Sequence, residues 1–188
     1  MIVHIHMPKS TNQKEKILNA ALKLFAKKGY SATPVSLIAK TAGVSQGLLY
    51  NFFAGKEEVL KEIAAAGFRQ IRLTTDVYKD EQDPRKAITL HINNVVKEMQ
   101  RNAPFWRTMH IVRLQEDVLK TIGPMAAELV NESIKIFTKA FTALNYDKPQ
   151  QEATLLFAQI DGLVALYLFD TKLPVQSLAQ QIINRYTK

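Results

Sequence analysis

Apolar residues recur along nearly the whole chain at the three- and four-residue spacing of an amphipathic helix. Near the N-terminus this stripe consists of Ile17, Leu18, Ala21, Leu22 and Phe25, which would share one helix face. No run of strictly alternating apolar and polar residues is flanked by turn dipeptides, so we expect no strands. The pattern predicts an all-α protein.

Breaks in the pattern divide the chain into about nine helices. The expected helices cover residues 11–28, 34–42, 46–52, 57–78, 84–101, 105–114, 123–144, 149–169 and 175–186. Short polar residues that can accept a backbone N–H precede several of them. The expected N-caps are Ser10 or Thr11, Thr33, Ser45, Asp83 and Asp147. Pro34 and Pro84 suit a first helical position, and Gly29 and Gly43 suit a helix end.

Composition narrows the class of protein. The chain has 188 residues, of which 47% are apolar, enough to build a core. It has no cysteine, which excludes disulfides and thiolate chemistry. The N-terminus lacks the basic start and long apolar run of a signal peptide, and the apolar run 155–169 is short for a membrane span. We therefore expect a cytoplasmic protein with no membrane partner. Translation could start at Met1 or Met7.

The net positive charge of the chain is concentrated in its N-terminal third. Residues 1–56 hold eight lysines and one acidic residue, Glu15, so this segment carries +7 of the net charge of +8. Such a distribution favours a polyanionic partner such as nucleic acid, although a solvated lysine-rich surface gives the same count.

A helix-turn-helix is predicted at residues 34–52. Two short helices flank the tripeptide 43–45, where Gly43 supplies the permissive residue that the turn requires. Ile38 and Ala39 would pack the first helix inward, and Leu49 would anchor the second, together with Phe52 or Phe53.

The opposite face of the second helix is polar and open. It carries Ser45, Gln46, Gly47, Leu48, Tyr50 and Asn51. Amides can pair with adenine, an apolar side chain can touch a thymine methyl, and hydroxyls suit phosphates. Gly47 costs the helix about 1 kcal/mol relative to alanine, and we interpret it as allowing close approach of the backbone to DNA.

These residues resemble the N-terminal domain of TetR-type regulators, in order and without insertion over about fifty positions. The matching residues are Ala21, Leu24, Phe25, Gly29, Tyr30, Thr33, Ile38, Ala39, Ala42, Gly43, Val44, Ser45, Gly47, Leu49, Tyr50, Phe53, Lys56 and Glu57. The resemblance implies that the helix after Ser45 enters the major groove, and that Tyr50, Lys56 and Thr33 contact phosphate. Gln46 and Leu48 depart from the residues common in the family, and these positions select the operator. The full predicted DNA-binding set is Thr33, Pro34, Ser36, Ser45, Gln46, Gly47, Leu48, Tyr50, Asn51 and Lys56.

The resemblance also implies a homodimer that reads operator DNA and a small-molecule effector of unknown identity. We expect a flexible tail at 1–9, a DNA-binding domain at 10–56 and a helical effector-binding and dimerisation domain at 57–188. The predicted dimer interface is Leu156, Ile160, Leu163, Val164, Tyr167, Leu178, Ile182 and Tyr186. The predicted ligand pocket is Phe68, His91, Met99, Trp106, Met109, His110, Phe137 and Phe141, although such residues are more often core.

We expect no enzyme, no cofactor and no metal site, because no catalytic or phosphate-binding motif occurs. His4 and His6 could bind a metal weakly, but they lie in the expected flexible tail, which does not favour a metal site. We expect a sequence-specific repressor that is released from its operator by a small-molecule effector. The alternatives are a non-specific DNA-binding protein, and an all-helical small-molecule-binding protein or enzyme.

Overall fold

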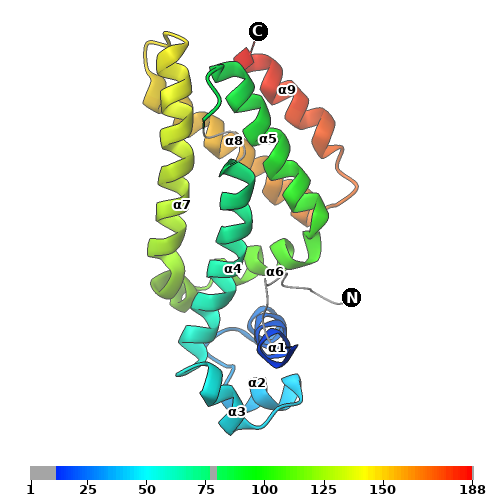
Figure 1. The fold of residues 1–188 in the computed structure, drawn as a ribbon. Coiled ribbons are helices and arrows are strands. Elements are labelled where there is room, and N and C mark those ends of the chain that lie inside the picture. The colour runs from blue at the N-terminus through cyan, green and yellow to red at the C-terminus, as the bar shows by residue number, and fades with distance from the viewer. Residues whose placement is uncertain (1–11, 77–79, 188) are drawn as a thin grey trace. The chain divides into compact units, whose positions relative to one another are not determined.

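The computed structural model describes residues 12–76 and 80–187. In these residues the chain forms nine α-helices and no strand, which confirms the all-α prediction (Figure 1). The helices are α1 (Asn12–Lys28), α2 (Val35–Ala42), α3 (Gln46–Phe52), α4 (Lys56–Asp76), α5 (Pro84–Arg101), α6 (Ala103–Arg113), α7 (Glu116–Ala143), α8 (Pro149–Phe169) and α9 (Val175–Thr187). The predicted tail at 1–9, the caps Ser10 and Thr11, and the two candidate start residues lie outside the described residues.

The helices group into two compact units that do not follow chain order. The first unit contains residues up to 69 together with 104–126, and the second contains 70–103 and 127–188. The first unit therefore holds α1, α2, α3 and most of α4, and also α6 and the beginning of α7. The predicted domain boundary at residue 56 stays a prediction, because a compact unit is defined by packing and not by independent folding.

The core of the first unit lies between α1 and the two short helices. Phe25 on α1 is completely buried, as are Ile38 on α2 and Leu49 on α3. α1 contacts both α2 and α3. Burial of large apolar side chains, each contributing about 1.5–3 kcal/mol, fixes the two short helices that would not be stable alone.

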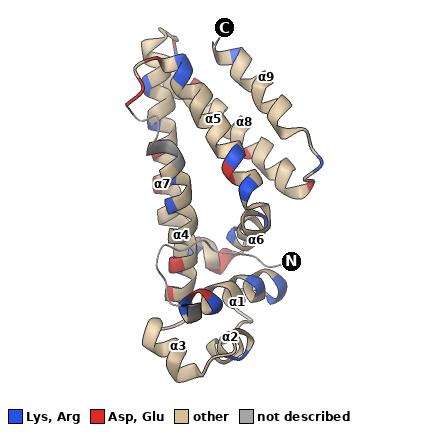
Figure 2. Ribbon diagram, turned by 45° about the vertical axis from the view of Figure 1, so that its right-hand side comes forward, with Lys and Arg blue, Asp and Glu red and all other residues tan. Residues whose placement is uncertain are grey.

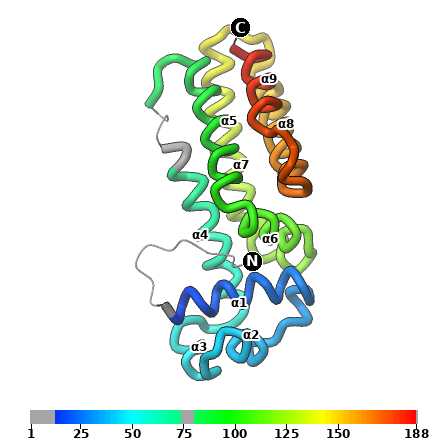
Figure 3. The backbone as a smooth tube through the Cα atoms, turned by 90° about the vertical axis from the view of Figure 1, so that its right-hand side faces the viewer, coloured from blue at the N-terminus to red at the C-terminus, as the bar shows by residue number. Residues whose placement is uncertain are grey.

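The second unit is built around α5, which contacts both α8 and α9 (Figure 3). Its aromatic core includes Phe137 and Phe141 on α7, both completely buried. The ring of His91 meets that of Phe137 edge-on at 4.5 Å, and the ring of Phe141 lies 5.3 Å from that of Tyr186. Burial lowers the pKa of His91 to about 4, so its imidazole is neutral at neutral pH.

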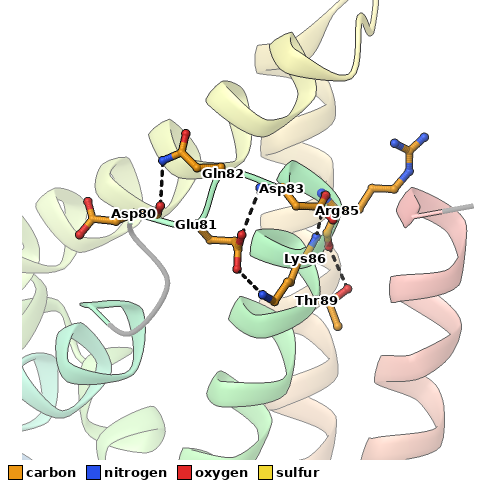
Figure 4. A network of polar contacts seen from close by, with 7 residues as sticks. All are labelled: Asp80, Glu81, Gln82, Asp83, Arg85, Lys86 and Thr89. Carbon is orange, nitrogen blue, oxygen red and sulfur yellow. Dashed lines mark hydrogen bonds and ion pairs between the residues drawn. The ribbon is translucent and has the colours of Figure 1, made fainter.

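The start of α5 shows the predicted cap. The carboxylate of Asp83 accepts the backbone N–H of Arg85 at 2.9 Å, and that of Lys86 at 3.4 Å (Figure 4). The Lys86 ammonium pairs with Glu81 at 2.7 Å. That hydrogen bond, with the N–H of Asp83 second, lowers the pKa of the Glu81 carboxyl group. The prediction of a cap followed by proline is therefore confirmed for α5.

Two local predictions in α7 and α8 are wrong. α7 starts at Glu116, seven residues before the predicted start, and runs through Pro124. Val118 and Ile122 are buried in that first part, and their packing outweighs the roughly 3 kcal/mol that an internal proline costs. α8 is preceded by Lys148 with no side-chain cap, so the expected cap at Asp147 does not form.

α8 is apolar over almost its whole length. By length and composition alone it could cross a membrane, yet a core helix of a soluble protein passes the same test. Leu156, Ile160 and Leu163 on one face are buried within the chain. The opposite face presents Leu155, Leu166 and Phe169, which are 55%, 59% and 90% exposed.

Candidate DNA-reading site

The turn between α2 and α3 is set by Gly43. Its φ of 70° is in the left-handed region, which glycine adopts without a Cβ penalty. Its N–H donates to Ala39 and Lys40, and the N–H of Val44 donates to Ala39 at 3.0 Å. These hydrogen bonds satisfy carbonyls near the end of α2, so that α3 starts at Gln46 in a fixed orientation.

Ser45 caps α3, as predicted. Its hydroxyl accepts the N–H of Leu48 at 3.1 Å. Leu49 within α3 is completely buried, and Phe53, which directly follows the helix, is 2% exposed. These two side chains fix α3 to the core. Of the two anchors left open by the sequence, Phe53 is the buried one and Phe52 is half-buried.

The remaining face of α3 lies uncovered. Gln46, Gly47 and Asn51 are exposed, Leu48 is half-buried, and Tyr50 is 49% exposed. A Cβ added at Gly47 would have no neighbour within 4 Å, so nothing in this chain requires a glycine there. Side chains that can pair with base edges and phosphates thus share one helix surface.

Thr33 behaves differently from its prediction. Its side chain is completely buried, and its hydroxyl donates to the Gly29 carbonyl at 2.7 Å. The N-cap of α2 is Pro34, and it makes no side-chain cap. Since Thr33 has no exposed surface in this structure, it supports the turn that precedes α2 and does not present its hydroxyl to a phosphate. Pro34 and Ser36 are exposed, and their contacts with DNA stay a prediction.

Lys56, at the first position of α4, folds back onto the loop after α1. Its ammonium donates to the carbonyls of Tyr30 and Ser31 at 3.0 and 3.1 Å, and lies 4.5 Å from the centre of the Tyr30 ring. An ammonium has three donors, so one remains for a phosphate. The phosphate contact of Lys56 stays a prediction, and the structure adds a bracing role.

The two helices that pack against α3 in the first unit carry exposed basic side chains. Figure 2 shows lysines along α1. Exposed lysines of α1 and α2 are Lys16, Lys23, Lys27, Lys28 and Lys40. Their positive potential suits the sequence-independent part of DNA affinity.

Sequence reasoning did not identify Gln115, which immediately precedes α7. Its side chain forms hydrogen bonds with the backbone of Phe25 in α1 and of Tyr30 just after α1, which lie 90 and 85 residues earlier in the sequence. No local motif marks such a residue, because its role depends on tertiary contacts only.

The predicted pocket residues divide between the two units. Phe68, Trp106, Met109 and His110 belong to the first unit, and His91, Met99, Phe137 and Phe141 to the second. The last four are nearly or completely buried, and His91 and Phe137 pack together as core. That these eight side chains line one cavity stays a prediction. The described residues contain no group of three potential metal ligands.

Four of the predicted interface residues face the interior of their own chain. Leu156, Ile160, Leu163 and Tyr167 are at most 8% exposed, so they are not available to a second copy, and this part of the interface prediction is corrected. The remaining residues, Val164, Leu178, Ile182 and Tyr186, are half-buried.

Comparison with known proteins agrees with this geometry. The family model of bacterial regulatory proteins of the tetR family matches residues 17–63. The HTH-type transcriptional regulator YhgD of Bacillus subtilis is 27% identical over 190 residues, which cover 85% of this chain and 96% of YhgD. The HTH-type transcriptional repressor KstR of Rhodococcus jostii is 25% identical and covers 92% of this chain and 78% of its own.

Solved structures share the fold over nearly the full length. The fatty acid degradation regulator FadR of Bacillus halodurans has a TM-score of 0.76 at 19% identity, covering 96% of this chain and 97% of that one. FadR of Bacillus subtilis, solved with stearoyl-CoA, has a TM-score of 0.74 at 21% identity and covers 92% of this chain and 97% of its own. Residues 17–63 therefore form a DNA-binding domain of the kind found in the tetR family of bacterial regulatory proteins, and the described helices share the fold of solved regulators of that kind.

Proposed function

We propose that this regulator is a repressor that holds a two-fold symmetric operator and releases it when the second half of the chain binds a long-chain fatty acyl effector. The observation that carries the DNA-reading role is the uncovered polar face of α3, fixed to the core by Leu49. Two copies of that face would occupy successive major grooves, about 34–36 Å apart. Such a protein works in the cytoplasm, where the chromosome lies.

The effector class is supported by relatives and by composition. FadR of Bacillus subtilis was solved with stearoyl-CoA, and a fatty acid metabolism regulator from the same organism is 44% identical over 45 residues, 24% of this chain. Apolar side chains dominate α8 in this chain, and an acyl chain needs apolar walls. An effector weakens operator binding only if it binds one conformation better than the other.

We further propose that two copies meet through the uncovered stripe of α8. Leu155, Leu166 and Phe169 lie on one face, separated by the exposed small residues Ala158 and Gly162. A Cβ at Gly162 would have no neighbour within 4 Å, so a second helix can approach closely there. Exposed apolar surface of this kind marks an interaction site.

Selection of bound sequences from a random duplex pool tests the DNA-reading role. Enrichment of a two-fold symmetric site at near-physiological salt is the expected result. Binding that fades uniformly as salt rises, with no enriched sequence, would instead indicate a non-specific DNA-binding protein.

Trp106 gives a direct test of the effector. It is the only tryptophan of the chain, is 7% exposed, and its indole N–H has no hydrogen-bond partner among the described residues. We expect stearoyl-CoA to change its emission with a saturable dependence, and to release the selected operator over the same concentration range. Coenzyme A without an acyl chain is the control. An operator that stays bound at saturating stearoyl-CoA would leave the regulator assignment intact but remove the acyl effector.

A further inference from the structure

The loop between α1 and α2 is held by two elements that lie far away in sequence. Lys56 of α4 donates to the carbonyls of Tyr30 and Ser31, as described above. On the α7 side, the side chains of Gln115, Asp117 and Thr121 reach the same loop; we name these three residues the α7 clasp. All of these residues belong to the first compact unit.

Gln115 makes the central contact of the clasp. Its carbonyl oxygen accepts the backbone N–H of Tyr30 at 2.7 Å, and its amide nitrogen donates to the carbonyl of Phe25 at 3.0 Å. The N–H of Gly29 donates to the same carbonyl at 3.1 Å. One glutamine side chain therefore satisfies both a donor and an acceptor at the C-terminal end of α1, where backbone groups lack partners within the helix.

The other two members extend this contact. The hydroxyl of Ser31 donates to the carboxylate of Asp117. The side chain of Thr121 lies close enough to the phenol of Tyr30 to lower its pKa. Burial, and next the nearby charge of Glu57, raise the pKa of the Tyr30 phenol above its ordinary value.

The loop leads directly to the DNA-reading helices. The ring of Tyr30 packs edge-on against that of Phe25 at 5.0 Å. The N–H of Thr33 donates to the carbonyl of Tyr30, and α2 starts at Val35. A shift of this loop would move the start of α2, and α3 with it, because both helices are fixed to the same core.

We propose that Gln115 is a positioning residue for DNA reading: the α7 clasp holds the loop after α1 in the geometry that allows α3 to enter the major groove. This inference rests on the assignment of α3 as the reading helix. It makes the start of α7 a route by which the effector-binding part of the chain can change operator affinity, because a displacement of α7 would act on the loop.

The test compares operator affinity of three full-length variants. Gln115→Ala removes both hydrogen bonds, while Gln115→Glu keeps an acceptor for the N–H of Tyr30 but loses the donor to Phe25. Glu116→Ala is the matched control, because this exposed carboxylate pairs with Lys120 of its own helix, at 2.8 Å. We expect Gln115→Ala to weaken operator binding at least about fivefold, Gln115→Glu to be intermediate, and Glu116→Ala to match the original chain.

Amide hydrogen exchange of Tyr30 separates positioning from general destabilisation. We expect its exchange to accelerate in Gln115→Ala, while the amides within α5 keep their protection. If Gln115→Ala does not fold, Asp117→Ala provides the test, since its exposed carboxylate accepts the hydroxyl of Ser31, and we expect about a threefold loss of operator affinity. Operator affinity within twofold of the original chain, in folded Gln115→Ala or in Asp117→Ala, would overturn the proposal. Failure of the original chain to select any operator would instead count against the proposed function.

Discussion

The helices α3 and α8 both leave one face uncovered, but with opposite chemistry. α3 has seven residues, buries Leu49, and presents glutamine, asparagine and tyrosine side chains. α8 has 21 residues, buries one apolar face, and presents a second apolar face that ends in Phe169, which is 90% exposed. The chemistry of each uncovered face indicates its partner: base edges and phosphates for α3, and apolar protein surface for α8.

The two helices also differ in what keeps them in place. α3 is too short to be stable alone and depends on the Ser45 cap, the Gly43 turn and the core beneath it. α8 packs along α5 and α9. A change on the uncovered face of either helix should therefore affect its partner and leave the fold of the chain intact.

The largest expected effect is at α8. Leu166→Arg places a charge in the middle of the apolar stripe, and we expect it to separate the dimer, because a desolvated unpaired charge is costly. A monomer carries one reading helix and binds one half-site without the added affinity that two joined reading helices provide, so operator affinity should fall about 100-fold or more. Sedimentation and operator titration measure the two effects.

Asn93→Arg, at an exposed position of α5, is the control for added charge, and it should remain dimeric. A Leu166→Arg variant that remains dimeric would show that the stripe of α8 is covered by something other than a second copy.

The next effect concerns the polar face of α3. We expect Gln46→Ala to remove discrimination at one base pair of each half-site, about 5- to 150-fold, since a bidentate amide contact contributes about 1–3 kcal/mol. Tyr50→Phe should instead weaken all sequences alike, because a phosphate contact carries no sequence information. Binding measured against a set of single-base operator variants distinguishes these outcomes. An unchanged preference in Gln46→Ala would remove this residue from base recognition.

The same comparison explains which parts of the molecule could be predicted from sequence. The face of α3 was predictable because local signals fix it: Gly43 sets the turn, Ser45 caps the helix, and the polar residues Gln46 and Asn51 mark the face opposite Leu49. α8 is apolar on almost every side, so its sequence pattern does not indicate which face is buried within the chain. The predicted interface therefore included Leu156 and the other residues that the structure buries, and missed the stripe on the other side.

The remaining errors have a similar physical origin. Thr33 has the residue type of a helix cap, but its hydroxyl finds the Gly29 carbonyl in a buried position, and the sequence cannot reveal this competition. Pro124 indicates a helix start by local preference, yet tertiary packing of Val118 keeps the helix continuous through it. Gln115 has no local signature at all, because its partners lie on α1 and after it.

The smallest expected effect is at Gly47 of α3, where the free energy of unfolding and operator affinity should change in opposite directions. Gly47→Ala removes a helix-breaking residue where an added Cβ meets nothing within 4 Å. We expect the free energy of unfolding to rise by up to about 1 kcal/mol, while operator affinity falls a few-fold because the methyl group occupies the space that the DNA backbone needs. Gly123→Ala, at another helical glycine where an added Cβ meets nothing within 4 Å beyond its chain neighbours, is the control for operator affinity, which it should leave unchanged. Its gain in stability should be smaller, because the ring of Pro124 disfavours a side chain on the helical residue before it. If Gly47→Ala leaves operator affinity as unchanged as Gly123→Ala does, the uncovered face at residue 47 does not approach DNA closely, and the reading surface of α3 must be centred on Gln46 and Tyr50 instead.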